Sequence, residues 1–135
     1  MIEEHSFGII LFREPRSYLL LRYIGGHWDF IKGHQEPGEP GIDTARRECK
    51  EETGITELQF LAGFEEKIDY YYARPGGKFH KYVVFYLAKT SESEVKLSDE
   101  HTNFVWLPYE EAVKRATHAN SKRVLIRAQE FLANA

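Results

Sequence analysis

One helix-like segment between runs of strand-forming residues constrains the fold of this chain more than any other feature. Residues 42–53 predict a helix, with Asp43 and Thr44 near its start and Gly54 suited to its end. The segments on both sides are rich in Val, Ile, Leu, Phe and Tyr, which favour strands. Strands that dominate the chain, one helix that interrupts them and further helices at the end predict a mixed sheet between helical layers, an α/β (α+β) sandwich.

The other predicted elements follow from hydrophobic spacing and turn residues. A hairpin is expected over 5–13 and 17–24, with Glu14, Pro15 and Arg16 between its strands. Residues 74–77, with one proline and two glycines, separate a second and longer pair of strand-forming runs. The remaining expected elements are strands over 28–31, 58–72, 79–89 and 103–107 and helices over 109–117 and 121–133.

Length, charge and cysteine content exclude several classes of protein. The 135 residues suit one domain, 1–135, and the net charge of -3 gives no general attraction to nucleic acid or anionic lipid. Cys49 is the only cysteine, which excludes an intramolecular disulfide and a cysteine-based zinc site. The first residues include no basic leader, and no apolar run approaches the roughly 20 residues of a membrane helix. We therefore expect a soluble cytoplasmic protein with no membrane contact.

The predicted helix at 42–53 carries an arrangement of like charges. Glu48, Glu51 and Glu52 stand at positions i, i+3 and i+4, so their carboxylates share one helix face and repel one another. They also lie in the C-terminal half of the helix, where the helix dipole disfavours negative charge. A solvated acidic surface is one interpretation. A site for Mg²⁺ or Mn²⁺ is the other, because carboxylate oxygens are the ligands these cations prefer.

The loop before this helix favours the cation interpretation. Residues 33–41 contain three glycines and two prolines, and backbone amides in such a loop can line a phosphate site. Lys32 and His34 flank the first glycine and could supply local positive charge. These features shift the balance from a solvated acidic surface toward a cation site beside a loop that could bind phosphate.

The segment from Gly33 to Ile55 resembles the Nudix box, G-x5-E-x7-R-E-U-x-E-E-x-G-U, in which U is a bulky aliphatic residue. Eight of the nine specified positions agree, and Cys49 stands at one of the aliphatic positions, where a buried thiol can act as a small hydrophobe. The matching residues are Gly33, Glu39, Arg47, Glu48, Glu51, Glu52, Gly54 and Ile55. The chain is therefore similar to Nudix hydrolases, which implies a Nudix-type α/β/α sandwich and metal-dependent cleavage of a phosphoanhydride bond.

This resemblance also implies a role for each matching residue. Glu48, Glu51 and Glu52 would hold the divalent ions, and the carbonyl of Gly33 would join them. Arg47 would orient Glu51 or Glu48 through an ion pair. Glu39 would support the loop or contact a metal ion through water.

A second resemblance points to one group within the family. The stretch WDFIKGHQEPGE looks like the W-x-x-P-K-G-H-x-E-P-G-E segment of asymmetrical diadenosine tetraphosphate hydrolases, with Ile31 in place of the proline. The later stretch KLSDEHTNFVWLPYEEA resembles their L-S-x-E-H-x-x-x-x-W-L segment. By this likeness Glu100 is an additional metal ligand or the general base, and the products would be ATP and AMP.

Such a substrate also needs contacts for its phosphates and its bases. Lys32 and His34 are candidates for the phosphates, as is Lys81, which matches a lysine of the same group. Aromatic side chains stack well on nucleobases. Among those of the predicted hairpin, Tyr71 and Tyr82 are the chosen candidates. Two tryptophans, Trp28 and Trp106, are expected in the core, and His118 and the closing helices are expected to be structural.

Two other classes of function remain open. Another Nudix substrate would use the same helix, for example ADP-ribose, a dinucleotide coenzyme or an RNA 5′ end, which is the only nucleic acid partner that we consider. A non-catalytic nucleotide-binding module is the second alternative. Such modules usually lack a glutamate or the arginine of the box, whereas this sequence retains all of them. The sequence predicts no oligomeric state.

Overall fold

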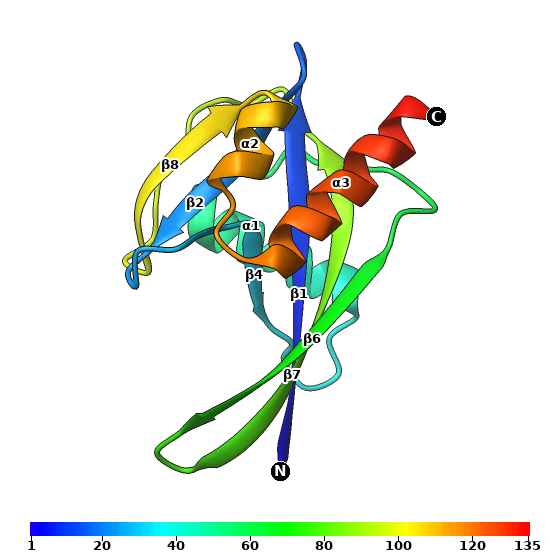
Figure 1. The fold of residues 1–135 in the computed structure, drawn as a ribbon. Coiled ribbons are helices and arrows are strands. Elements are labelled where there is room, and N and C mark those ends of the chain that lie inside the picture. Colours follow the sequence, from blue (N-terminus) through cyan, green and yellow to red (C-terminus); the bar gives the residue numbers. More distant parts are fainter.

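The structure is a computed structural model that describes residues 1–135, and an eight-stranded mixed sheet forms its centre (Figure 1). The strands are β1 (Ile2–Arg13), β2 (Ser17–Tyr23), β3 (Trp28–Asp29), β4 (Ile31–His34), β5 (Gln59–Phe60), β6 (Glu66–Arg74), β7 (Gly77–Lys89) and β8 (His101–Leu107). The helices are α1 (Gly41–Thr53), α2 (Tyr109–Arg115) and α3 (Ala119–Ala133).

Strand β1 organises the sheet because it has neighbours along its whole length. It runs parallel to β7 from Ile2 to Phe12, and on its other side it pairs antiparallel with β4 and then with β2. Strands β6 and β5 pair with β7, while β3 and β8 pair with β2. The short strand β4 therefore meets β1 in the middle of the sheet and leads directly into the loop before α1.

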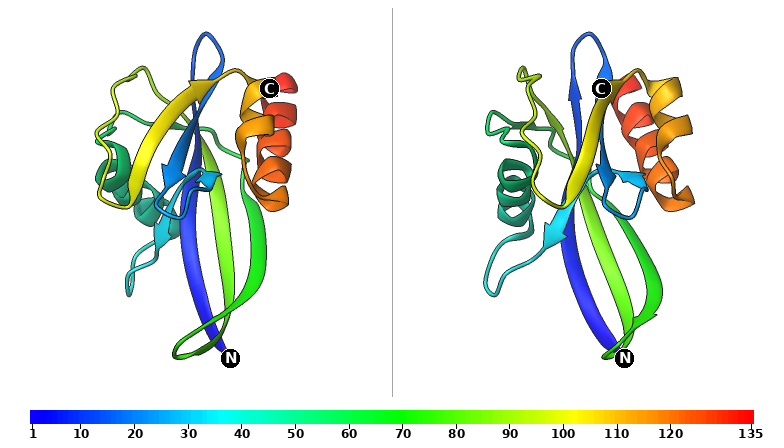
Figure 2. Two further views of the ribbon diagram at one scale, coloured as in Figure 1. Left: turned by 60° about the vertical axis from the view of Figure 1, so that its left-hand side comes forward. Right: turned by 90° about the vertical axis from the view of Figure 1, so that its left-hand side faces the viewer.

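Helices cover both faces of the sheet, as the sequence predicts. Helix α1 lies on one face and α2 and α3 lie on the other, which Figure 2 shows from two sides. Beneath α1, residues such as Ile9, Leu21 and Cys49 form one core. The second core lies under α2 and α3 and contains Phe85 and Leu125. Burial of these two apolar surfaces holds the three layers together.

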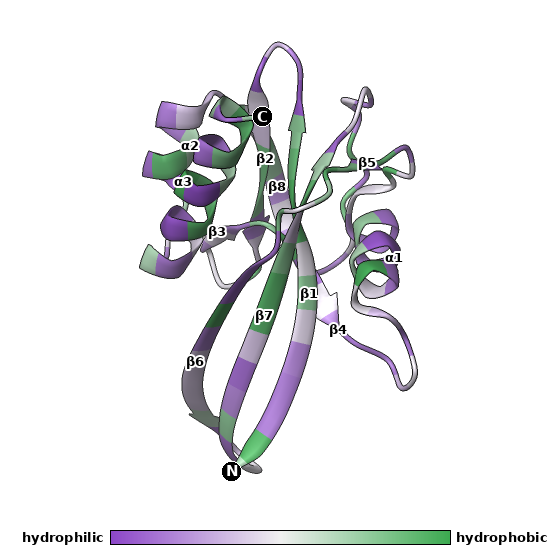
Figure 3. Cartoon of the chain, turned by 90° about the vertical axis from the view of Figure 1, so that its right-hand side faces the viewer, coloured by the Kyte–Doolittle hydropathy of each residue, from purple (hydrophilic) through white to green (hydrophobic).

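The cover does not extend over the whole sheet. The β6–β7 hairpin and the start of β1 project beyond the helices, and this end is more hydrophilic than the covered end (Figure 3). This projecting end adjoins the end of β4, since Ser6 of β1 pairs with His34. None of the helices is long and apolar enough to cross a membrane.

Two of the expected strands are divided in the structure. The run over 58–72 is interrupted at 61–65, where Gly63 adopts a positive φ of 95°, so β5 and β6 are separate. The strand expected over 28–31 breaks at Phe30, because the N–H of this residue donates to the carboxylate of Asp29 (2.8 Å). The helix expected over 109–117 ends at Arg115, and the one expected over 121–133 begins at Ala119.

Candidate active site

Gly33 and Glu48 are in close contact where β4 meets α1. Gly33 pairs with Phe7 of β1, and a Cβ atom at Gly33 would lie 1.9 Å from the Cδ atom of Glu48. Only a residue without a side chain leaves room for that carboxylate. The first glycine of the box therefore has a steric role that the geometry explains.

Arg47 lies at the centre of an ion-pair network that ties the loop to the helix. Its Nε and Nη2 atoms donate to the two carboxylate oxygens of Glu39 at 2.9 and 3.0 Å. Its Nη1 atom donates to Glu48 at 2.9 Å and to Glu51 at 3.3 Å, and Nη2 also donates to the backbone carbonyl of His34 at 2.9 Å. The guanidinium thus contacts both glutamates that the resemblance suggested, and Glu39 in addition.

Glu39 is well satisfied by its neighbours. Besides Arg47, it accepts hydrogen bonds from the Thr44 hydroxyl (2.6 Å) and from the backbone N–H of Glu36 (3.2 Å). These bonds stabilise the charged form and lower the pKa of Glu39 to about 2. Its oxygens are already occupied, which supports a role in holding the loop.

Glu52 is in the opposite situation. It is only 2% exposed, and neither of its carboxylate oxygens has a hydrogen-bond partner. Burial, followed by the nearby charge of Glu48, raises the pKa of Glu52 well above its usual range. The nearest basic group is the imidazole of His101, whose Nε2 atom lies 3.6 Å from Oε1.

These residues fit a divalent cation. An orphaned buried carboxylate next to two further glutamates on one helix face is a costly arrangement that a cation would stabilise. The side chains do not form a closed cluster of three or more ligands. An open arrangement suits Mg²⁺, which usually keeps several waters and also binds substrate phosphates.

A cleft of about 410 Å³ opens in front of this helix face. Its walls come from four elements and from the loop before β8, and they bring together residues that are distant in sequence. The lining residues are Tyr23, Lys32, Gly33, His34, Glu48, Lys81 and Glu100. Of the predicted site residues, six therefore lie in one cleft, and Glu51 and Glu52 extend from the adjoining helix.

The two lysines of the cleft differ in how their charge is balanced. Lys32 forms an ion pair with the buried Asp29 (Nζ to Oδ2, 3.0 Å). Burial alone would lower the pKa of Lys32, but the charge of Asp29 outweighs it and the pKa is raised. Lys81 forms no ion pair, and burial together with the charge of Lys32 lowers its pKa. A bound anion such as a phosphate would stabilise the charge of Lys81.

A second cavity, of about 510 Å³, lies on the other side of Lys32. It is lined by His27, Asp29, Lys32, Ile68, Tyr70, His118, Ala119, Asn120 and Ser121. The rings of His27 and His118 are 5.4 Å apart, so the start of α3 contributes to this cavity. Neither His118 nor Tyr70 is a site candidate from sequence, but both line this cavity.

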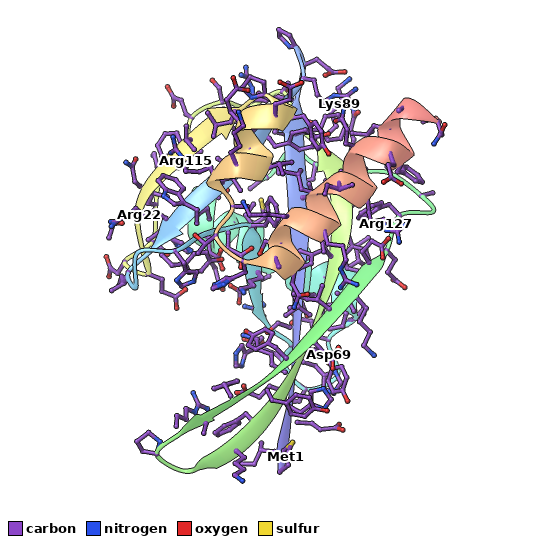
Figure 4. The ribbon with its side chains drawn as sticks, viewed as in Figure 1. Met1, Arg22, Asp69, Lys89, Arg115 and Arg127 are labelled. Atoms are coloured by element: carbon purple, nitrogen blue, oxygen red, sulfur yellow. The ribbon has the colours of Figure 1, made fainter.

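Tyr71 and Tyr82 lie outside both cavities. Successive side chains of a strand point to opposite faces, and the register pairs Tyr70 with Lys81 but Tyr71 with His80. Tyr71 and Tyr82 therefore lie on the sheet face opposite to Lys81, where the Tyr71 ring stacks on His80 (4.0 Å) and the Tyr82 ring lies tilted against it (4.2 Å). Asp69, which bonds to His80 at 2.6 Å, marks this face of the projecting hairpin in Figure 4. The register, which the sequence pattern does not fix, decides which tyrosines meet the lysines.

The fold and the acidic helix with its glycine contact define a class of protein. The chain belongs to the Nudix family, since the NUDIX domain matches residues 3–129. Members of this family generally use a divalent metal ion.

Individual relatives are similar over nearly the whole chain. Asymmetrical bis(5′-nucleosyl)-tetraphosphatase of Sus scrofa is 36% identical in an alignment that covers 94% of this chain and 94% of the relative. The enzyme of the same name from Caenorhabditis elegans is 35% identical over 132 residues, covering 93% of this chain and 94% of the relative. A crystal structure of a C. elegans Ap4A hydrolase binary complex superposes with a TM-score of 0.86 at 33% identity, over 98% of this chain and 99% of that one.

Proposed function

We propose that this protein hydrolyses diadenosine tetraphosphate to ATP and AMP with Mg²⁺ or Mn²⁺. One observation supports the proposal most: Lys32 lines both the cleft that contains Glu48 and Glu100 and the cavity that contains Tyr70. Such an arrangement suits a ligand whose phosphate chain lies in the cleft and whose base enters the cavity. The similar proteins that carry the tetraphosphatase name support the same substrate class.

In this proposal the helix carboxylates hold the cation. Glu48, Glu51 and Glu52 are the ligands, with Glu100 and the carbonyl of Gly33 as further ones. A divalent ion there would neutralise negative charge on the phosphates and make a water molecule more acidic. Arg47 holds Glu48 and Glu51 in place through ion pairs.

Proton removal from the attacking water is assigned to Glu100. It lies on the loop before β8 and lines the cleft, so it can approach a phosphate bound between Lys81 and Glu48. Glu39 is a poor base, because Arg47 and Thr44 occupy its oxygens and its pKa is about 2.

Binding of the substrate is assigned to both sides of Lys32. Lys32, Lys81 and His34 would contact the phosphates. Tyr70 offers a half-buried aromatic ring in the cavity on which a base can stack, with His118 nearby. Tyr71 and Tyr82, the aromatic candidates from sequence, would then contribute to hairpin stability through cross-strand stacking instead.

The alternative substrates are ADP-ribose, a dinucleotide coenzyme and an RNA 5′ end. Each contains a pyrophosphate bond that would be cleaved with the cation held by the same helix. The two-cavity arrangement favours a ligand with a long phosphate chain over ADP-ribose. A non-catalytic module is disfavoured, because the glutamates and the arginine of the box are all present and adjoin the cleft.

A product assay tests the proposal. The protein is incubated with diadenosine tetraphosphate and Mg²⁺, and in parallel with ADP-ribose and a triphosphorylated RNA, and the products are separated by ion-exchange chromatography. We expect ATP and AMP in equal amounts, no ADP, and no turnover in EDTA, with Glu52→Gln as the inactive control. Faster turnover of another substrate would overturn the tetraphosphate assignment. A lack of turnover for all three would favour the non-catalytic module.

A further inference from the structure

His101 is the one buried imidazole that faces a candidate metal ligand. It begins β8, its side chain is 0% exposed, and its ring packs edge-on against Tyr23 at 4.4 Å. Its Nε2 atom has no hydrogen-bond partner, and neither has the Oε1 atom of Glu52, 3.6 Å away. Two orphaned buried groups that face each other at this distance need only a small shift to form a hydrogen bond.

The other ring nitrogen of His101 is already engaged. Its Nδ1 atom lies 3.1 Å from the hydroxyl oxygen of Ser98, and its backbone N–H donates to the carbonyl of Ser98 at 3.2 Å. A serine hydroxyl that donates to Nδ1 leaves the proton of a neutral imidazole on Nε2. In that tautomer the ring presents an N–H donor to the nearby Oε1 atom of Glu52.

The same turn also carries Glu100. The backbone N–H of Glu100 lies 3.4 Å from the Ser98 hydroxyl, and its carbonyl accepts a hydrogen bond from Ile24 at 3.2 Å. His101 therefore connects the loop that holds Glu100 to the helix that holds Glu52, although the two glutamates are 48 positions apart in the sequence.

We infer that His101 is a positioning residue, whose Nε2–H holds one oxygen of Glu52 so that the other oxygen is free to bind a divalent ion, while the Ser98–His101 turn sets Glu100 beside it. The inference rests on the proposed function only through the metal role of Glu52. Groups that orient metal ligands in this way typically change metal affinity or activity about 10–100-fold when they are removed.

Two substitutions of His101 separate orientation from packing. His101→Phe keeps an aromatic ring against Tyr23 and removes the donor, whereas His101→Gln places an amide N–H near the position of Nε2. Mn²⁺ binding is measured without substrate, by the electron paramagnetic resonance signal of free Mn²⁺, and folding is checked by circular dichroism. We expect the dissociation constant for Mn²⁺ to rise about 10–100-fold in His101→Phe and to return to within a few-fold of the wild type in His101→Gln.

Other outcomes would overturn the inference. Wild-type Mn²⁺ affinity in a folded His101→Phe protein would show that Glu52 needs no support. Equal weakening in both folded variants would assign His101 a packing role. If His101→Phe does not fold, Ser98→Ala decides, since it removes only the hydroxyl. We expect a several-fold loss of Mn²⁺ affinity there, and an unchanged affinity would refute the inference. These binding measurements hold whether or not the protein cleaves the tetraphosphate.

Discussion

Glu39, in the loop before α1, and Glu52, on α1, have opposite surroundings. Glu39 accepts two hydrogen bonds from Arg47 and one from Thr44, and its pKa falls to about 2. Glu52 is buried without a partner, and burial and the charge of Glu48 raise its pKa well above the usual range. Environments that separate the pKa values of two carboxyl groups assign them different roles. Glu39 stabilises the loop, and Glu52 is held at a cost that a cation can relieve.

The largest effect is expected from Glu52→Gln. Loss of a metal ligand should lower kcat by roughly 10³-fold, because stabilisation by a metal ion amounts to several kcal/mol. Without metal, the same change should raise the free energy of unfolding at pH 8 by about 1–3 kcal/mol, since it removes the cost of keeping this buried carboxyl group protonated at a pH where the unfolded chain ionises it. Turnover assays with Mg²⁺ and urea unfolding in EDTA measure the two effects. A variant that loses activity and stability together would contradict the account of Glu52 as a metal ligand whose burial destabilises the metal-free protein.

A large effect is also expected from Gly33→Ala. The new Cβ atom would overlap the carboxylate of Glu48, which must then move away from Arg47 and from the cleft. Misplacement of a reacting group by about 1 Å can cost 10²-fold in rate, and we expect a loss of that order in kcat. The flexible end of Glu48 can yield, so the melting temperature should change little. Gly25→Ala is the matched control, since no atom there comes closer than 3.4 Å. Equal activity of the two variants would argue against a role for this contact.

Arg47→Lys tests the surroundings of Glu39, the carboxylate whose oxygens already have hydrogen-bond partners. A lysine keeps the charge but cannot reach Glu39, Glu48 and the carbonyl of His34 at the same time. We expect kcat/KM to fall about 10–100-fold and Mg²⁺ to bind more weakly. The pKa of Glu39 should rise toward its ordinary value of 4.5, which can be followed by NMR of its side-chain carboxyl carbon. An unchanged pKa would show that Thr44 and Glu36 suffice to hold this carboxylate.

The sequence predicts the helix carboxylates and the layers but not which residues of the other strands line the cleft and the cavity. Glu48, Glu51, Glu52 and Gly33 stand at fixed spacing, so local helix geometry suffices to bring three of them to one face. Tyr70 could not be distinguished from Tyr71, because a shift of one residue in register exchanges the two faces of a strand. The contact between His27 and His118 depends on how α3 packs on the sheet, which no local pattern records.

A smaller effect is expected in the pH dependence of the stability of the metal-free protein, to which Glu39 and Glu52 contribute in opposite directions. The lowered pKa of Glu39 contributes stability above its ordinary value of 4.5, and this is lost as the pH falls from 4.5 toward 2. The raised pKa of Glu52 acts the other way, because the folded protein holds a proton that the unfolded chain releases above pH 4.5. In EDTA, stability should therefore decline from pH 5 to pH 8 in the wild type and less so in Glu52→Gln. Urea unfolding across this range measures how the free energy of unfolding changes with pH in both proteins. Equal slopes would show that the surroundings of Glu52 do not raise its pKa.

The smallest effect is expected from Cys49→Val, on the buried side of the same helix. Cys49 is 0% exposed and packs in the core under α1, and its Sγ atom lies 3.6 Å from the Thr53 hydroxyl. Burial raises the pKa of its thiol to about 11, so a thiol reagent should not label the native protein at pH 8 and should label it after unfolding. Valine is apolar and larger than cysteine by about one methyl group, so the free energy of unfolding should change by no more than about 1–3 kcal/mol and kcat by less than about twofold. A larger loss of kcat with intact folding would mean that this packing sets the position of Glu52, three residues along the helix, and that the two sides of α1 are not independent.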